Sequence, residues 1–428
     1  MFNNILQHPI GKRIIKGSFW SLFGTAIGKF FILISSIFCA RILGEYEYGE
    51  LGIIRSTIAM FIVVGTAGIS VTASKYISQY RANNEISEFL SIKVITQRFA
   101  IIFGLIISCL IFFFADSLAR NTLEAPELAT DLKWGAILLF FSIYNAYQNG
   151  ILSGFENFKA IGLNTLYAGI FEFGFIVIGA NLGGVTGAII GYGISFIIFS
   201  YINSYSIRNT FKQYNLPNTP IKIQKKHYVI LWRFALPAAL NSIIVTASFW
   251  CLKTLLIRNS GFGELGIYEA ADQWKVIMLY IPTSLSNILL PILSNVLSTG
   301  KSTVKIVKYN IILNVGLSTV FAIGVSLCSG FIMGFYGPNF ENPYPLIILS
   351  ISTIFTTMAL VSTTAMTSKA KVWTNFIFQL IWSISMIGSA IYFLSEGLGA
   401  VGLALSILVS YMLLSITQTI YFFSYYKN

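Results

Sequence analysis

Apolar segments of about twenty residues recur along the whole chain, and this feature constrains the fold more than any other. A segment of that length crosses the hydrocarbon core of a bilayer as a helix. Charged residues make up only 10% of the chain, whereas soluble domains carry about 25%. The sequence therefore predicts an all-α integral membrane protein. Twelve transmembrane helices can be placed, at about 17–40, 51–75, 93–115, 133–153, 160–182, 184–206, 230–257, 267–296, 306–334, 344–366, 372–394 and 398–422.

A repeated pentapeptide divides these spans into two equal sets. Gly-Glu-Leu-Gly-Ile opens the second span at 49–53 and returns at 263–267, 214 positions later, which is half of the 428 residues. A glycine-rich opening at 182–188 has a similar counterpart at 398–402. Because each half has six spans, both halves take the same orientation and form parallel repeats about a pseudo-twofold axis along the membrane normal. We therefore expect two six-helix lobes around a V-shaped central cavity.

The predicted lobes cover residues 1–212 and 229–428, and a basic linker at 213–228 joins them. Lys and Arg concentrate in alternate connecting segments, which indicates that those segments and both termini are cytoplasmic. This topology accounts for most of the net charge of +12, so no nucleic-acid partner is needed to explain it. The outer segments hold only Arg41, Arg120, Lys133 and Arg258.

Residues that usually carry catalysis or bind metals are sparse and scattered. The four cysteines lie inside apolar spans at no motif spacing, which is typical of small core residues. Both histidines, His8 and His227, fall on the cytoplasmic side. A membrane glycosyltransferase, polymerase or ligase would need a catalytic constellation, often on a long outer loop, and the chain has no such loop. We therefore expect no enzyme activity, no catalytic residues, no metal and no cofactor.

Seven ionisable residues lie within the apolar spans, where topology does not explain them. Burying a charge at the centre of a bilayer costs roughly 2.5–3.5 kcal/mol even on lenient scales, so such residues usually face protein or water and serve a function. A structural or scaffold role is hard to reconcile with them. The seven are Lys29, Arg55, Glu172, Lys253, Glu269, Asp272 and Lys275.

Four of the seven are cations on the first two spans of each lobe, and we interpret them as a substrate-binding set. Lys29 and Lys253 lie on the first spans, each on a stripe of mostly small or polar residues, and Arg55 and Lys275 lie on the second. Lys29 is about a dozen residues from either surface, which favours a functional role. Arg55 and Lys253 are nearer span ends, where the alternative is a side chain that extends to the interface.

The three acidic residues are candidates for ion coupling or for a gate. Asp272 and Lys275 are three positions apart on one helix, so mutual neutralisation is the alternative for them. Glu172 fits a carboxyl hydrogen-bonded within its lobe as well as it fits a proton-coupling site. Arg55 and Glu269 are 214 positions apart and so occupy equivalent places in the two lobes. This register predicts that they pair across the outer mouth of the cavity when it closes.

Short motifs near the start of the chain resemble those of a known family. They are Gly17-Ser18-Phe19-Trp20, Gly28-Lys29, Ala40-Arg41-Ile42-Leu43-Gly44 and Tyr48-Gly49. The chain resembles bacterial polysaccharide flippases, the Wzx-type O-antigen and repeat-unit transporters of the multidrug/oligosaccharidyl-lipid/polysaccharide exporter superfamily. The twelve spans, the two lobes, the basic linker and the length agree with this resemblance along the whole chain.

The resemblance implies a multi-pass protein of the bacterial inner membrane that moves an oligosaccharide on undecaprenyl diphosphate from the cytoplasmic to the outer leaflet. It further implies alternating access, coupling to protons or sodium, and contact with membrane lipids, a polysaccharide polymerase and a chain-length regulator. Lys29 and Arg55 fall where related flippases place cavity cations, and Lys253 and Lys275 match less closely. A diphosphate that crosses a bilayer needs cations that replace its hydration.

Two other transport functions stay open. A multidrug efflux antiporter of the same superfamily handles organic cations and would need acidic cavity residues. A flippase for lipid II-type peptidoglycan precursors would carry the same diphosphate with a different sugar headgroup. Basic residues outnumber acidic ones among the seven intramembrane charges, which favours a flippase over the antiporter.

Overall fold

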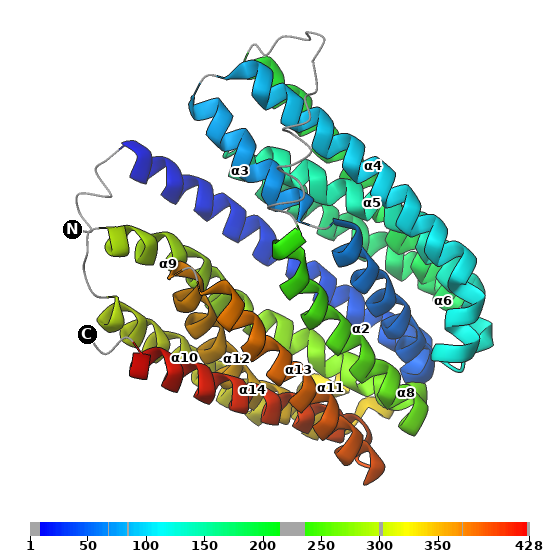
Figure 1. Cartoon of the computed structure of the whole chain (residues 1–428). Helices are drawn as coiled ribbons and strands as arrows, with labels where there is room; N and C mark the ends of the chain where they lie inside the picture. Colours follow the sequence, from blue (N-terminus) through cyan, green and yellow to red (C-terminus); the bar gives the residue numbers. More distant parts are fainter. Residues whose placement is uncertain are drawn as a thin grey trace. The chain divides into compact units, whose positions relative to one another are not determined.

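Helices account for most of the chain (Figure 1). The computed structural model describes residues 9–66, 68–83, 85–214, 236–298, 303–369 and 371–425, and no strand occurs within them. The predicted linker at 213–228 lies outside these residues, apart from its first two positions. The α-helices are α2 (Pro9–Thr66), α3 (Ile69–Ala82), α4 (Ile86–Ser117), α5 (Ala129–Gly154), α6 (Phe158–Gln213), α8 (Leu236–Met278), α9 (Tyr280–Ser298), α10 (Val304–Leu327), α11 (Ser329–Gly334), α12 (Tyr344–Ser368), α13 (Val372–Ser395) and α14 (Gly399–Tyr425).

Glycines divide the three longest helices into two arms each. Gly44 in α2 and Gly261 in α8 have φ angles of 75° and 84°, a left-handed conformation that glycine adopts at little cost. In α6 the break falls at Gly183 and Gly184, with φ angles of −146° and 57°. The helices α3, α9 and α11 continue the arms that precede them in the chain. When the arms are counted separately, the described helices correspond to the twelve predicted spans.

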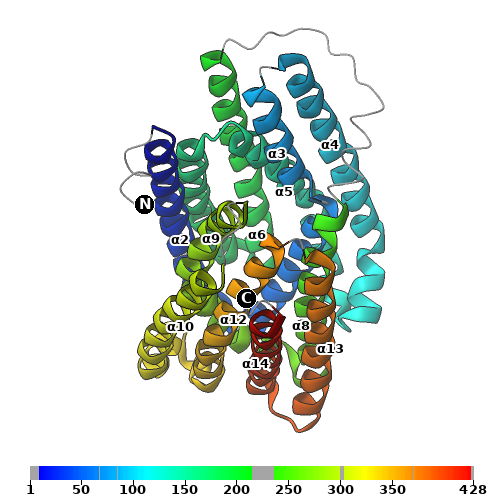
Figure 2. The same ribbon diagram turned by 60° about the vertical axis from the view of Figure 1, so that its left-hand side comes forward.

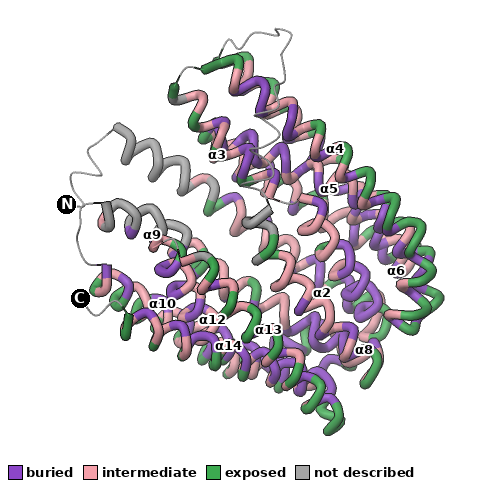
Figure 3. Tube along the Cα trace, viewed as in Figure 1, coloured by how far each residue is buried: buried purple, intermediate pink, exposed green. Residues whose placement is uncertain are grey.

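The helices have the length and the surface of membrane spans. Within the described residues, seven helical segments are long and apolar enough to cross a membrane. This number is lower than twelve because broken helices such as α6 count as one segment and because α5 and α8 are not among the seven. Large apolar side chains face outward, as on α4, where Phe113 is 77% exposed and exposed positions recur along the helix (Figure 3). The chain is a multi-pass membrane protein.

The chain divides into two compact units, each made of two stretches of sequence. Unit 1 consists of Met1–Ser35 and Ile54–Ile243, and unit 2 of Ser36–Ile53 and Ile244–Asn428. The short stretch with the break at Gly44 therefore packs with the second half of the chain. The predicted lobe boundaries follow the order of the helices instead, and they stay a prediction.

Matching helices surround a central helix in each unit. In unit 1, α5 packs against α3, α4 and α6, and in unit 2, α12 packs against α9, α10 and α14. Figure 2 shows α12 between α10 and α14. Since α5 and α12 are the fourth predicted spans of their halves, their shared surroundings support the sequence repeat.

A buried amide pair also recurs at matching places in the two units. The side chain of Asn164 donates to Asn203 at 2.8 Å in unit 1, and that of Gln418 donates to Asn375 at 3.0 Å in unit 2. Each pair joins the last two spans of its half, and Asn203 and Gln418 are 215 positions apart. This spacing is within one residue of that between the pentapeptides, so the pairs are further evidence of the repeat.

Both pentapeptides lie in unit 2, where their glycines permit close helix packing. A methyl group on Gly49 would overlap with the carbonyl oxygen of Phe262, and one on Gly266 would overlap with that of Glu45. Only glycine therefore fits where the second arm of α2 crosses the second arm of α8. The Glu264 carboxylate accepts a hydrogen bond from a backbone amide at the start of α14 at 2.7 Å, where an acidic group is favoured by the helix dipole.

Candidate functional site

Two clusters of ionisable side chains form the candidate site, one in each unit. The unit 1 cluster consists of Lys29 and Arg55, on the two arms of α2, and Glu172 on the first arm of α6. The first arms of α2 and α6 approach closely at Gly28 and Gly169, since a methyl group on Gly169 would lie only 2.8 Å from the Cα atom of Gly28. Lys29 follows Gly28 directly, and Glu172 comes about one helical turn after Gly169. The glycine contact therefore brings Lys29 near Glu172.

Arg55 is held by both arms of α6. Its Nη2 atom lies 3.4 Å from Oε1 of Glu172 on the first arm, and the two side chains are 21% and 14% exposed. Its guanidinium carbon lies 4.9 Å from the centroid of the Tyr192 ring on the second arm. This cation–π contact adds to the ion pair, so Arg55 has partners of two kinds within its own unit.

Lys29 has neither an ion pair nor a hydrogen bond to any residue that the structure describes. Its electrostatic interaction is with Glu172, the carboxylate that Arg55 already contacts. Among the contacts of this cluster that the structure describes, two cations thus share one carboxylate.

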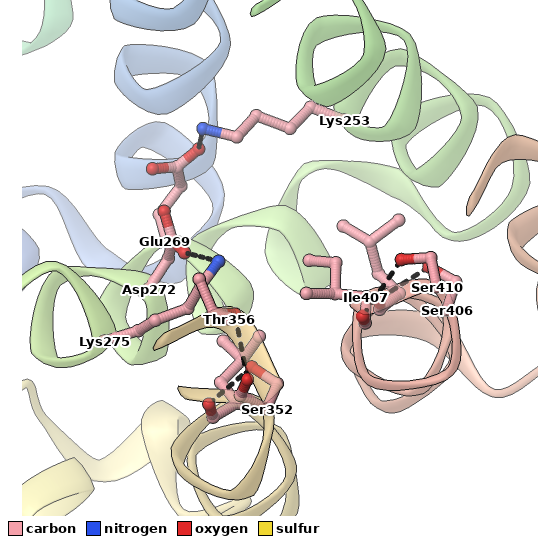
Figure 4. A network of polar contacts seen from close by, with 11 residues as sticks. Lys253, Glu269, Asp272, Lys275, Ser352, Thr356, Ser406, Ile407 and Ser410 are labelled. Atoms are coloured by element: carbon pink, nitrogen blue, oxygen red, sulfur yellow. Dashed lines mark hydrogen bonds and ion pairs between the residues drawn. The ribbon is translucent and has the colours of Figure 1, made fainter. Parts of the chain in front are cut away.

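The unit 2 cluster is built on α8, whose two arms fold back on each other at Gly261. Lys253 lies eight residues before Gly261 and Glu269 lies eight residues after it. An antiparallel pair of arms places these residues at the same level, and Lys253 Nζ lies 2.7 Å from Glu269 Oε1 (Figure 4). Their side chains are 12% and 8% exposed. The result is a close and buried ion pair.

A second ion pair follows on the same arm of α8. Lys275 Nζ lies 3.2 Å from Asp272 Oδ1 and 5.0 Å from the centroid of the Phe249 ring. Asp272 also interacts electrostatically with Lys253. The unit 2 cluster therefore contains two cations and two carboxylates, and its charges balance.

Figure 4 also shows hydroxyl side chains of α12 and α14 in the same part of unit 2. Ser352 donates to a carbonyl of its own helix at 2.6 Å, and Thr356 does so at 2.8 Å. Ser406 and Ser410 do the same on α14, at 2.7 and 3.0 Å. Because these hydroxyls donate to backbone carbonyls of their own helices, any charged donors for an anion in the unit 2 cluster are the two lysines, once they leave their carboxylates.

The structure gives contacts for several alternatives that the sequence leaves open. Lys275 pairs with Asp272, as their spacing predicts. Glu172 contacts a cation of its own unit, in agreement with a carboxyl bonded within its lobe. Lys253 turns to a carboxylate on the neighbouring arm instead of extending alone from the end of its span.

Two of the pairings are not predicted from the sequence. Arg55 and Glu172 are 117 positions apart, and no local pattern connects them. Lys253 and Glu269 do carry a signal, since they are equally far from Gly261, but it is informative only once the break at that glycine is known. Arg55 and Glu269 each have a partner within their own unit, and their pairing with each other stays a prediction.

The chemistry available in these clusters is ionic recognition. Among the described residues, no group of three His, Cys, Asp or Glu side chains could hold a metal ion. Lysine and arginine donate charge-assisted hydrogen bonds to phosphate and carboxylate groups. The arrangement therefore suits an anionic ligand.

The fold is similar to that of solved transporters. A multidrug resistance MATE family transporter of the MOP superfamily, in its inward-facing conformation, has a TM-score of 0.78 at 14% identity, covering 92% of this chain and 93% of that chain. An outward-facing conformation of such a transporter has a TM-score of 0.73 at 16% identity, covering 97% and 96%. A MOP superfamily transporter from Pyrococcus furiosus, whose binding pocket has reverse polarity, has a TM-score of 0.72 at 17% identity, covering 97% and 96%. The fold is thus the twelve-helix, two-lobe fold of MATE transporters.

Two relatives are similar in sequence. A putative O-antigen transporter of Shigella flexneri is 24% identical over 409 residues, which cover 92% of this chain and 94% of that protein. The EPS I polysaccharide export inner membrane protein EpsE of Ralstonia solanacearum is 24% identical over 198 residues. The second match covers 44% of each chain, so this chain spans less than half the length of that relative.

A family match covers most of the chain. Residues 14–297 match the family described as polysaccharide biosynthesis protein. This range begins in the first arm of α2, ends in α9 and includes both charged clusters. The chain therefore belongs to the polysaccharide biosynthesis protein family.

Proposed function

We propose that the protein moves an oligosaccharide linked to a polyprenyl diphosphate from the cytoplasmic to the outer leaflet of a membrane. The family supports this function, as does the relative named as a putative O-antigen transporter, which matches along 92% of the chain. Transport follows alternating access, in keeping with the inward- and outward-facing conformations of proteins with this fold.

The observation that carries the proposal is that Lys29 has no ion pair with any residue that the structure describes and shares Glu172 with Arg55. A lysine within a membrane span costs roughly 2.5–3.5 kcal/mol, so it is retained where it meets a polar ligand or water. The diphosphate is a compact anion whose oxygens accept hydrogen bonds from ammonium and guanidinium groups. Lys29 is its first ligand in this scheme, and Arg55 is the second, since its contact with Glu172 is long at 3.4 Å.

The lysines of unit 2 bind the diphosphate later in the cycle, because each must first leave a carboxylate. Lys253 leaves Glu269 and Lys275 leaves Asp272, which exposes two buried negative charges. A proton or a sodium ion taken up by these carboxylates, or by Glu172, compensates for the loss. Such an exchange would couple an ion gradient to transport.

The charges argue against a multidrug antiporter. An organic cation needs a carboxylate that is free to bind it, whereas Glu172, Glu269 and Asp272 each contact a cation. A lipid II-type precursor carries the same diphosphate, and the two clusters would not distinguish it from a polysaccharide repeat unit. Discrimination between these lipids must come from contacts with the sugars.

In the cell, we place the protein in the bacterial inner membrane with both termini in the cytoplasm, because Lys and Arg concentrate in the segments on that side. It acts as a transporter and not as an enzyme, surrounded by membrane lipids. A polysaccharide polymerase and a chain-length regulator would receive its product at the outer face.

Reconstitution tests the proposal. Vesicles that contain the purified protein and a fluorescent lipid-linked oligosaccharide should move the lipid between leaflets, as measured by quenching of the fluorophore from outside. A proton gradient and a sodium gradient are imposed in separate experiments to identify the coupling ion. Vesicles with the protein that flip the lipid no faster than protein-free vesicles, under every gradient, would contradict the proposal.

A further inference from the structure

A pocket of about 310 Å³, lined by both apolar and polar side chains, lies between the two arms of α6 in unit 1. It is at the end of this helical hairpin that topology predicts to face the cytoplasm. Amide, hydroxyl and tyrosine side chains line it together with one lysine and three aliphatic residues, and none of the seven intramembrane charges takes part. The lining includes Lys159, Asn164, Tyr167, Tyr205, Asn209 and Gln213.

The inner part of the pocket is fixed by hydrogen bonds. Asn164 donates to Asn203 at 2.8 Å and accepts from the hydroxyl of Ser206 at 3.1 Å. Nearer the end of the hairpin, Asn157 donates to the hydroxyl of Thr210 at 2.9 Å. These bonds join the two arms of α6, so a ligand would meet a preorganised wall.

The outer part of the pocket offers side chains that make no hydrogen bond to the described residues. Tyr167 and Tyr205 are 48% and 62% exposed, and neither ring contacts another ring or a cation among the described residues. Asn209 and Gln213 make no hydrogen bond to the residues that the structure describes, so each amide has both donors and an acceptor free for a ligand. Lys159 is exposed, and its Nζ atom lies 5.6 Å from the centroid of the Trp20 ring.

This combination fits a sugar next to a phosphate. Aromatic faces cover the apolar C–H surface of a sugar ring, and amide groups satisfy its hydroxyls, which both donate and accept. A lysine at the rim attracts an adjoining phosphate as a point charge. An interfacial belt accounts for the two tyrosines, and hydrogen bonds between the arms account for the inner amides, but neither accounts for the amides of Asn209 and Gln213.

We propose that this pocket binds the glycosyl phosphate portion of the lipid substrate in the cytoplasmic leaflet, before the diphosphate reaches Lys29. The inference rests on the proposed function and adds the place where the sugar is recognised. It supplies the discrimination between sugar headgroups that the two charged clusters lack. A soluble sugar phosphate has the same chemistry, and the experiment separates it from the lipid.

The test measures equilibrium binding to the purified full-length protein in detergent. The probes are lipid-linked oligosaccharide extracted from the producing bacterium, polyprenyl diphosphate without sugar, a soluble hexose phosphate, and phosphatidylglycerol. The variants are Tyr205→Ala and Asn209→Ala, with Tyr205→Phe to keep the ring. Tyr201→Ala is the matched control, because Tyr201 lies one turn earlier on the same helix, is 75% exposed and does not line the pocket.

We expect Tyr205→Ala and Asn209→Ala to weaken binding of the glycosylated lipid about tenfold, the effect of one lost good contact. Their affinity for polyprenyl diphosphate without sugar should stay within about twofold, which also shows that the variants are folded. Tyr205→Phe and Tyr201→Ala should bind both lipids as the wild type does. The soluble hexose phosphate should compete only weakly, because it lacks the lipid anchor.

Several results would overturn the inference. They are equal losses for the glycosylated and sugar-free lipids, no loss for either, or phosphatidylglycerol binding that responds to the variants as strongly as the glycosylated lipid does. Tight binding of the soluble hexose phosphate would assign the pocket to a soluble ligand instead. Flipping in vesicles separates the two proposals. If the unmodified protein flips no lipid, the proposed function is refuted. If Tyr205→Ala and Asn209→Ala flip and bind the glycosylated lipid as well as the unmodified protein does, only the pocket is refuted.

Discussion

The charged clusters of the two units differ in how their charges are compensated. In unit 1, Lys29 has no ion pair among the described residues, and Arg55 contacts Glu172 at 3.4 Å. In unit 2, each lysine has a carboxylate of its own, at 2.7 Å for Lys253 and at 3.2 Å for Lys275. Among the described residues, homologous halves of one chain thus carry one cluster in which two cations share a carboxylate and one in which each cation has its own.

This difference suggests that the two clusters act at different stages of binding an anion. The unit 1 cluster can accept a phosphate without losing an existing contact of Lys29. The unit 2 cluster must first separate ions that are at most 19% exposed, and leaving one charge of a buried pair without its partner is costly. We therefore expect unit 1 to determine affinity, and unit 2 to respond once the substrate is bound.

The largest effect on transport should come from Lys29→Ala. Removing one donor from a desolvated diphosphate site costs about 1.5–3 kcal/mol or more, which should abolish export of surface polysaccharide while the protein still accumulates in the membrane. Lys29→Arg should retain part of the activity, because the charge remains. Wild-type export by Lys29→Ala at normal protein levels would remove the basis for assigning the ligand to unit 1.

In unit 2, single and double substitutions should have opposite consequences for stability. Lys253→Met leaves Glu269 buried without its cation, and we expect a loss of about 3–5 kcal/mol in the free energy of unfolding. The double variant Lys253→Met, Glu269→Met should recover most of this loss and still transport slowly. Thermal unfolding in detergent, measured beside flipping in vesicles, separates the two effects. A double variant as unstable as the single one would show that the pair is not an isolated unit.

The helix crossing in unit 2 offers a smaller test with a control in the same pentapeptide. A methyl group on Gly266 would overlap with the carbonyl oxygen of Glu45, whereas one on Gly263 would lie 3.6 Å from its nearest neighbours, an ordinary contact distance. Gly266→Ala should therefore lower the free energy of unfolding by about 1–3 kcal/mol, and Gly263→Ala should not. Equal stability of the two variants would mean that the crossing is not tightly packed in solution.

The smallest effect concerns the predicted gate, in which Arg55 and Glu269 pair with each other. Such a pair at a partly desolvated mouth would shift the balance between conformations by about 1 kcal/mol. Exchanging the charges, with Arg55→Glu and Glu269→Arg together, should then restore what each single change loses. Cysteines at the two positions should crosslink and stop transport until they are reduced. If bifunctional thiol reagents of every spacer length fail to crosslink the two cysteines, the two residues do not face each other.

Much of the fold follows from hydropathy and the repeat, because span length and glycine positions are local properties of the sequence. The seven intramembrane charges are visible in the same way, since any charge in an apolar span stands out. The partners of most of these charges, in contrast, are not predicted from the sequence. Lys29 comes near Glu172 because Gly28 and Gly169 allow the first arms of α2 and α6 to approach closely, and such packing is not encoded in a local pattern. The α6 pocket cannot be predicted from a local sequence pattern either, because its amides lie on both arms of the hairpin.

Binding of the diphosphate provides the most direct test of the central claim that the cations of unit 1 hold the substrate. The affinity of purified protein for polyprenyl diphosphate should be measured for the wild type, Lys29→Gln and Lys275→Gln, with polyprenyl monophosphate as a second ligand. We predict that Lys29→Gln binds the diphosphate at least about tenfold more weakly, the loss of one charge-assisted donor, and that Lys275→Gln changes affinity much less. Equal affinities for wild type and Lys29→Gln, or a larger loss in Lys275→Gln, would contradict the account.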